Sequence, residues 1–140
     1  MSARSKARKA ALDLLYEADI RRTAADLLLA QRIETLEYLI RDYTRDLVSG
    51  VVLNRVKIDE LIQTYAQGWD FDRMPVIDRN LLRIAIFELL YREDIPTSVA
   101  ISEAIELAKA LSTEESANFI NGVLATIEKI RGGLVLLLKI

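Results

Sequence analysis

The sequence contains no cysteine and no histidine among its 140 residues. Without thiols and imidazoles, the chain has no disulfide, no thiolate chemistry and no metal site built from thiolate or imidazole ligands. Catalytic arrangements that use a histidine base are excluded as well. Carboxylates are plentiful, but the pairs Glu103 with Glu106 and Glu114 with Glu115 lie where the first turns of helices favour acidic residues. We therefore expect no enzyme, no metal and no cofactor.

Glycine and proline are also scarce, with five and two residues. Neither glycine-rich motif for nucleotide phosphates, G-x-x-x-x-G-K-[ST] or G-x-G-x-x-G, occurs. The apolar C-terminal run LVLLLKI is far shorter than the roughly 17 to 25 residues of a membrane-spanning helix. The basic N-terminus lacks the apolar core and cleavage site of a secretory signal, so we expect a cytoplasmic protein. The formal charge is only -2, so any affinity for nucleic acid must come from a local patch.

Helical periodicity is present along nearly the whole chain, and no alternating run competes as a strand. With 51% hydrophobic and 29% charged residues, the composition is that of one compact domain. The pattern predicts an all-α fold with about seven helices. We expect these helices over residues 5–22, 24–31, 37–56, 59–67, 75–93, 97–111 and 113–131.

Several residues mark the expected helix ends. Gly68 is placed to end the fourth helix, and Pro75 suits the first turn of the fifth. The connector between them is the one predicted internal boundary, which gives helical subdomains 1–67 and 68–131 and an apolar tail 132–140. Ser112 and Glu115 have the spacing of a capping box.

Other glycines and the fifth helix carry further expectations. Gly50 either weakens the third helix or lets another helix approach. Gly132 and Gly133 should end the last helix, and the tail then packs against its own domain or a partner chain. The segment between Leu81 and Tyr91 is apolar nearly all round, which predicts a central, buried helix.

Basic residues gather at the N-terminus before the first acidic residue, Asp13. They are Arg4, Lys6, Arg8 and Lys9. At about 100° per residue, Lys6, Lys9 and Tyr16 share one side of the first helix. Such a run is either a solvated face or a phosphate-binding patch, and Lys9 can pair with Asp13 at the i,i+4 spacing.

The segment ESANFINGVL, residues 115–124, has an unusual outer surface for a helix. Helical projection places Phe119 at the edge of the buried stripe, beside Glu115. Phe119 is then either an edge aromatic packed under a neighbouring loop or a stacking platform for an unpaired base. Asn118 and Asn121 offer amide donors and acceptors, and Gly122 on the outer side allows close approach to the backbone.

Two charged residues, Arg83 and Glu88, interrupt the apolar fifth helix. They are five residues apart and cannot pair with each other, so each needs another partner. A structural pair within the fold is one interpretation, and a docking contact with another protein is the other. Asp78 and Arg79 could join either arrangement.

Longer motifs in the C-terminal half carry a family resemblance. They are Trp69, the block DRNLLRIAIFELL, an Ile-Pro pair followed by VAISEAIELAK, and ES-x-x-FINGVL. In this order and spacing they resemble the NusB family of bacterial transcription antitermination factors. The N-terminal ARSKARKAALDLLYEADI is similar to that family's basic first helix with its Leu-Tyr pair.

The resemblance implies two small helical bundles packed together and a non-catalytic function. Members bind boxA, a single-stranded RNA element in ribosomal RNA operon leaders, together with NusE, a small-subunit ribosomal protein. The pair joins the elongating RNA polymerase with other Nus factors and helps it pass termination signals.

The resemblance also implies roles for individual residues. Tyr16, Asp78 and Arg83 correspond to the side that meets NusE. The resemblance implies RNA binding by Arg4, Lys6, Arg8 and Phe119, with Glu115 and Asn118 adjacent, and the helix projection adds Lys9 to this set. Ser5 departs from a position that is often basic, which predicts weaker RNA affinity, and the apolar tail leaves monomer or homodimer open.

Two alternatives belong to other classes. One is the helical RNA-binding module of RNA cytosine methyltransferases, although 140 residues leave no room for a cofactor-binding domain. The other is a helical protein-docking module that never touches RNA.

Overall fold

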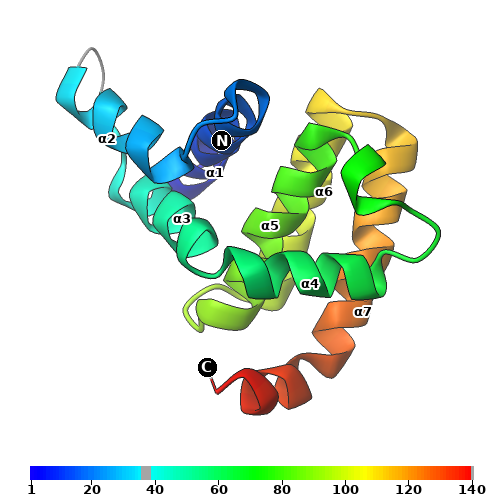
Figure 1. Ribbon diagram of the computed structural model, residues 1–140. Helices are drawn as coiled ribbons and strands as arrows, with labels where there is room; N and C mark the ends of the chain where they lie inside the picture. Colours follow the sequence, from blue (N-terminus) through cyan, green and yellow to red (C-terminus); the bar gives the residue numbers. More distant parts are fainter. Residues whose placement is uncertain (36–38, 140) are drawn as a thin grey trace.

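The computed structural model describes residues 1–35 and 39–139, and these residues form helices connected by short loops (Figure 1). In chain order the elements are α1 (Ala3–Arg21), α2 (Ala25–Thr35), α3 (Asp42–Leu53), α4 (Arg55–Tyr65), a 3-10 helix η1 (Phe71–Arg73), α5 (Val76–Tyr91), α6 (Thr97–Leu111) and α7 (Glu114–Leu138). Seven α-helices and no strand occur in this part of the chain. The predicted all-α fold is confirmed.

Helix α5 is the centre of the core. Residues 80–90 are buried without interruption. The helix packs against α1, α3 and α4 and against α6 and α7, and Figure 1 shows it between these groups. The prediction of a central, buried helix is confirmed. The division into subdomains at residue 68 stays a prediction.

The predicted third helix, 37–56, is divided in the structure. Residues 37 and 38 lie outside the described part, α3 ends at Leu53, and α4 begins at Arg55. Between them, Asn54 leaves the helical backbone region and donates its side-chain amide to the Gly50 carbonyl at 2.8 Å. An asparagine side chain that bonds the backbone locally offers an alternative to the regular helix, which explains the break.

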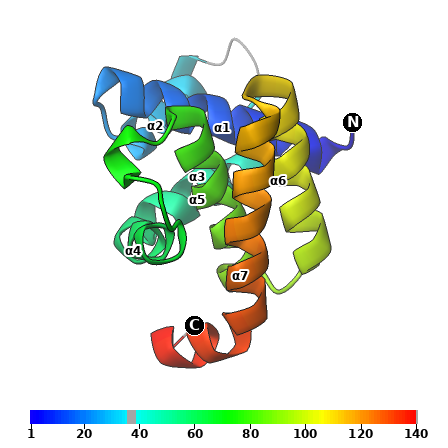
Figure 2. The same cartoon turned by 90° about the vertical axis from the view of Figure 1, so that its right-hand side faces the viewer.

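The prediction that Gly132 and Gly133 end the last helix is wrong. Helix α7 continues to Leu138, and its last part bends away from the rest (red in Figure 2). Each glycine costs a helix about 0.5–1 kcal/mol. Burial of the Leu134 side chain, which is 8% exposed, stabilises the folded helix by about 1.5–3 kcal/mol. The tail therefore packs on its own domain, while Leu136 and Leu137 stay exposed.

The start of α7 is one residue later than the predicted capping box. Thr113 is the N-cap, and its hydroxyl accepts a hydrogen bond from the Ser116 amide at 3.0 Å. The Ser112 hydroxyl donates instead to Asp78 Oδ1 at 2.9 Å. A buried carboxylate on α5 thus competes for the serine that the local pattern had assigned to the cap.

Gly50 lets α3 approach α5 closely. A Cβ added at Gly50 would lie 2.2 Å from the ring of Phe87, so the second of the two predicted roles applies. We expect Gly50→Ala to lower the free energy of unfolding by about 1–3 kcal/mol through overpacking. Urea denaturation measures this. Gly132→Ala, where an added Cβ meets no atom within 4 Å, should be neutral or stabilising, and equal losses in both variants would contradict the explanation.

Candidate nucleic-acid interface

A groove of about 370 Å³ lies between the end of α4 and the outer face of α7. Helix α7 contributes Asn118, Phe119 and Gly122, which are three of the residues singled out in the sequence. The end of α4 and the turn after it contribute Tyr65 and Gln67. The structure therefore gathers the outer surface of ESANFINGVL into one concave site.

Phe119 is half-buried and forms the aromatic wall of this groove. Its ring contacts Trp69, with ring centroids 4.8 Å apart and an angle of 37° between the planes. Trp69 itself is 40% exposed. Phe119 thus packs under the connector after α4, as the first interpretation predicted, and it also lines the groove, while base stacking stays a prediction.

Sequence reasoning missed Tyr65 and Gln67, which line the groove, and Trp69, which contacts Phe119. They follow one another at the end of α4, and the turn carries Gly68 with a φ of +82°, a backbone conformation that favours glycine. The only signal in the sequence was Trp69 as a family motif. Its contact with Phe119 joins positions that are far apart in the chain.

The groove combines flat rings with amide groups. Gln67 and Asn118 are exposed and offer both donors and acceptors. A Cβ added at Gly122 would meet no atom within 4 Å, so the helix surface is open there. Glu115, one turn before Phe119, is exposed to solvent. Such a site suits an unpaired base, which can stack on an aromatic ring and bond through its edge.

Arg8 does not belong to the exposed basic run, and its predicted contact with RNA is not supported. Its side chain is 3% exposed, and Nε donates to both carboxylate oxygens of Glu88 at 3.0 and 3.1 Å. The reason lies in the helical spacing, because Arg8 shares the buried face of α1 with Leu12 and Leu15 at the i+4 and i+7 positions.

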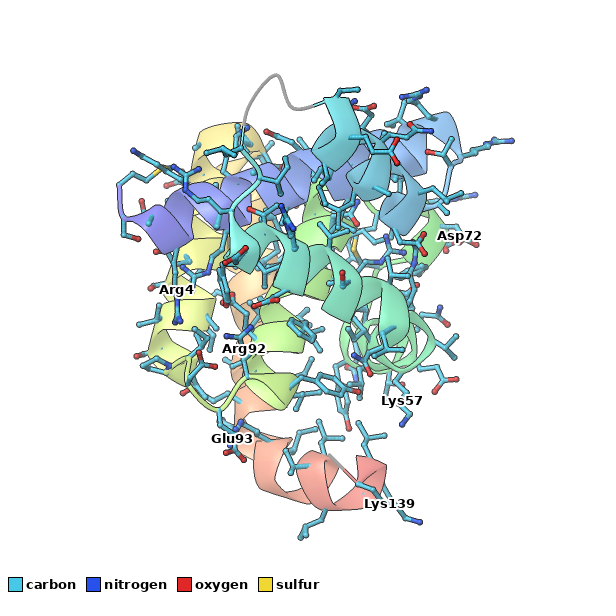
Figure 3. All side chains as sticks on the ribbon, turned by 90° about the vertical axis from the view of Figure 1, so that its left-hand side faces the viewer. Arg4, Lys57, Asp72, Arg92, Glu93 and Lys139 are labelled. Carbon is cyan, nitrogen blue, oxygen red and sulfur yellow. The ribbon has the colours of Figure 1, made fainter. Side chains whose placement is uncertain are left out.

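The other N-terminal cations remain at the surface with different degrees of pairing. Lys9 Nζ lies 2.8 Å from Asp13, as predicted. Arg4, which is labelled in Figure 3, lies 3.3 Å from Asp94, and its guanidinium carbon lies 4.9 Å from the centroid of the Tyr43 ring. Lys6 is exposed and makes no ion pair with any described residue. The patch is therefore smaller than the sequence predicts.

Ser5, the departure from the family pattern, faces the neighbouring helix. It is 8% exposed, and its hydroxyl donates to Glu103 Oε1 on α6 at 2.5 Å. A basic side chain at this position would meet Glu103 before it met a ligand. The side chain at position 5 therefore affects the packing of α1 against α6 more directly than it affects RNA binding.

Two of the three residues predicted to meet the partner are buried. Asp78 is 0% exposed, and Arg83 is 2% exposed. Arg83 donates to Asp59 and to Asp19, in each case at 2.8 Å. Their assignment to a partner surface is not supported, because α5 is surrounded by other helices. Tyr16, at 40% exposure, remains available.

The structural interpretation of the charged residues on α5 is confirmed. Arg83 binds acidic residues of α1 and α4, and Glu88 binds Arg8 of α1. Arg79 joins the first group through Asp19 at 3.8 Å. Each charge inside the apolar helix thus has a partner on another helix.

These buried charges perturb the pKa values of their neighbours. Burial opposes the charge on Asp19, but the Asn80 hydrogen bond and nearby arginines outweigh it and lower the pKa of this carboxyl. Burial raises the pKa of Tyr43, and the Glu88 carboxylate that accepts its hydroxyl hydrogen raises it further. At the surface, hydrogen bonds from Arg92 hold the pKa of Asp94 at about 2.

The basic N-terminus and the groove do not form one patch. Met1 and Ser5 line a hollow with Glu103 and Leu107 of α6, whereas Tyr65 lies against α7. In Figure 2 the N-terminus and α4 lie on either side of the α6 and α7 pair. A strand that touches both sites must cross this pair.

Two features are absent from residues 1–35 and 39–139. None of the helices there has the length and apolar character needed to cross a membrane. The same residues hold no group of three or more acidic side chains placed to bind a metal ion.

Comparison with known proteins identifies the family to which the chain is similar. The sequence model of the NusB family matches residues 5–129. Transcription antitermination protein NusB of Arthrobacter sp. (strain FB24) is 48% identical over 135 residues, which cover 96% of this chain and 99% of that protein. The corresponding protein of Nocardioides sp. is 51% identical over 127 residues, covering 91% and 94%.

Solved structures agree in fold. T. maritima NusB superposes with a TM-score of 0.81 at 38% identity, covering 91% of this chain and 92% of that one. A crystal structure of antitermination factors NusB and NusE in complex with dsRNA gives a TM-score of 0.78 at 27% identity, covering 90% and 96%. The chain therefore belongs to the NusB family.

Proposed function

We propose that this protein is a transcription antitermination factor that binds boxA-type single-stranded RNA together with NusE. Family membership supports the role, and a related structure contains NusB, NusE and RNA in one complex. The observation that carries the proposal is the half-buried ring of Phe119, held by Trp69 at the wall of an amide-lined groove.

The chemistry of binding follows from the side chains present. An unpaired base stacks on Phe119, a contact worth about 1–3 kcal/mol in single-strand binders. Asn118 and Gln67 supply hydrogen bonds to base edges. Lys6, with Lys9 and Arg4, attracts the phosphate backbone without regard to sequence. The role is binding without catalysis, in the cytoplasm, as part of an RNA polymerase complex with other Nus factors.

The direct test is fluorescence anisotropy of a labelled boxA-like strand and a scrambled strand, with and without NusE. We expect preference for boxA and tighter binding with NusE, because a second RNA-contacting surface raises affinity through the joint complex. Equal binding of both strands, or none with the partner present, would overturn the proposal. Partner binding without any RNA binding would identify a docking module.

The salt dependence of RNA binding by the isolated chain should be shallow. Of the basic run at the start of α1, only Arg4, Lys6 and Lys9 reach solvent, and Arg4 and Lys9 are already paired with Asp94 and Asp13. With about 1–3 phosphate contacts, the slope of log K against log salt should lie at about -0.7 to -2. Titrations at four salt concentrations measure it. A slope steeper than about -4 would indicate a larger basic surface than these three cations provide.

The proposed NusE contact is best tested at Tyr16. Because its side chain is 40% exposed, Tyr16→Ala should leave the free energy of unfolding nearly unchanged. We expect NusE binding to weaken by more than about 1 kcal/mol, roughly fivefold, if the ring is an anchor of the interface. Calorimetric titration with NusE gives the affinity. Unchanged affinity would remove Tyr16 from the interface.

A further inference from the structure

A buried polar network holds the first turns of α1 against two other helices. Arg8 donates Nε and Nη2 to Glu88 of α5, and its Nη1 lies 3.3 Å from Glu103 of α6. Ser5 donates to the same oxygen of Glu103 at 2.5 Å. The Tyr43 hydroxyl of α3 donates to Glu88. One arginine thus joins α1 to two carboxylates on two helices.

The backbone of α1 is held at the same place. The Thr44 hydroxyl, 1% exposed, donates to the Ala7 carbonyl at 3.0 Å. Ala7 and Ala11 are both 0% exposed, so only small side chains separate α1 from its neighbours there. Apolar contacts alone do not fix the orientation of one helix against another, because the hydrophobic effect is non-directional. A bidentate guanidinium pair does, because its planar fork matches the carboxylate in one geometry.

The residues held in this way lie beside the exposed cations. Lys6 and Lys9 belong to the same two turns as Ser5 and Arg8 and point outward where those two point inward. Helix α5, which carries Glu88, packs against both α1 and α7. The network therefore sets where the basic turns stand relative to the Phe119 groove.

We propose that Arg8, bound by Glu88 and Glu103, is a positioning residue that fixes the basic turns of α1 so that one RNA strand meets Lys6 and the Phe119 groove together. This inference rests on the proposed function. A strand bound at the groove presents its next phosphates to α1 at a high effective concentration only while the two sites keep a fixed separation. Loosening α1 removes this gain and leaves each separate contact intact.

Strand length separates positioning from general damage. A strand of about four nucleotides reaches the groove alone, whereas one of about twelve can cross to α1. A loosened α1 should weaken the long strand toward the affinity of the short one and leave the short strand unchanged. A variant that is merely less folded weakens both equally.

The test compares Glu103→Ala with Glu17→Ala in the full chain. Both replaced carboxylates bind arginines and are partly exposed, at 24% and 30%, and both changes remove one negative charge. Removal of a negative charge reduces the repulsion of RNA phosphates, so electrostatics alone predicts higher RNA affinity in both variants. We expect Glu103→Ala to lose about tenfold for the long strand and less than twofold for the short one. Glu17→Ala should lose nothing for either.

Arg8→Lys provides a second variant, because it keeps the charge and removes the bidentate fork. Positioning predicts the same length-dependent loss, whereas a direct phosphate contact by Arg8 would be retained by lysine. Circular dichroism verifies that both Glu103→Ala and Arg8→Lys are folded. Equal RNA affinities of wild type and Glu103→Ala for the long strand would overturn the inference.

Amide hydrogen exchange tests, without RNA, whether the Arg8 network holds the first turns of α1. Amides of residues 6–11 should exchange faster in Glu103→Ala than in wild type, while those of α7 stay protected. If the wild type binds no RNA, the proposed function fails, and exchange still reports on the network. Unchanged protection of residues 6–11 would show that the network does not hold α1.

Discussion

Replacing Phe119 with alanine should weaken binding of a boxA-like strand by about 1–3 kcal/mol, roughly 5- to 150-fold. The ring is the aromatic wall of the groove between α4 and α7, and Trp69 holds it in place. Alanine removes the stacking surface, while the amides of Asn118 and Gln67 remain. The loss should therefore be larger for strands with unpaired bases than for a duplex of the same charge.

The single tryptophan of the chain provides the measurement. Trp69 lies 4.8 Å from Phe119 between ring centroids, so its fluorescence should change when a base enters the groove. Phe119→Leu is the matched control, because leucine keeps an apolar side chain without a ring. Equal affinities of wild type, Phe119→Leu and Phe119→Ala would remove stacking from the mechanism.

Replacing Glu88 with alanine should lower the free energy of unfolding by about 3–5 kcal/mol. The change leaves the guanidinium of Arg8 inside the protein without its bidentate partner, and the Tyr43 hydroxyl loses its acceptor as well. Arg8 and Glu88 are 3% and 1% exposed, so water cannot replace the lost carboxylate without opening the core.

Urea denaturation followed by circular dichroism measures the loss, with Asp94→Ala as the matched surface control. Asp94 also binds arginine, but its side chain is 49% exposed, and such pairs are worth at most about 1 kcal/mol. The double variant Arg8→Met with Glu88→Leu should recover most of the stability, because apolar groups can replace a buried pair. Equal losses in Glu88→Ala and Asp94→Ala would contradict the buried-pair explanation.

Much of the fold follows from local patterns. Apolar spacing predicted the helices, the buried α5 and the helical surface around Phe119. Lys9 and Asp13 pair as their spacing indicated. These features depend on residues within one or two turns, and a period of 3.6 residues records them directly in the chain.

The site was predicted only in part, because the sequence pattern records contacts within one helix and not contacts between helices. Phe119 and Asn118 were found because they lie on one helix face. Their groove partners Tyr65 and Gln67 were not, since no local pattern joins α4 to α7. Gly132 and Gly133 predict a helix end, but Leu134 is buried on the domain and α7 continues past them.

The sequence alone determined that this chain is all-α, contains no cysteine or histidine, and carries the motifs of its family. The tertiary structure decided which charges face solvent. Arg8 resembles its basic neighbours in sequence, yet its partner Glu88 lies 80 residues away. A charged side chain can be buried only where a distant partner meets it, because an unpaired charge in the core costs several kcal/mol, on the order of half the stability of a domain. Only the packing of α1, α5 and α6 brings those partners together.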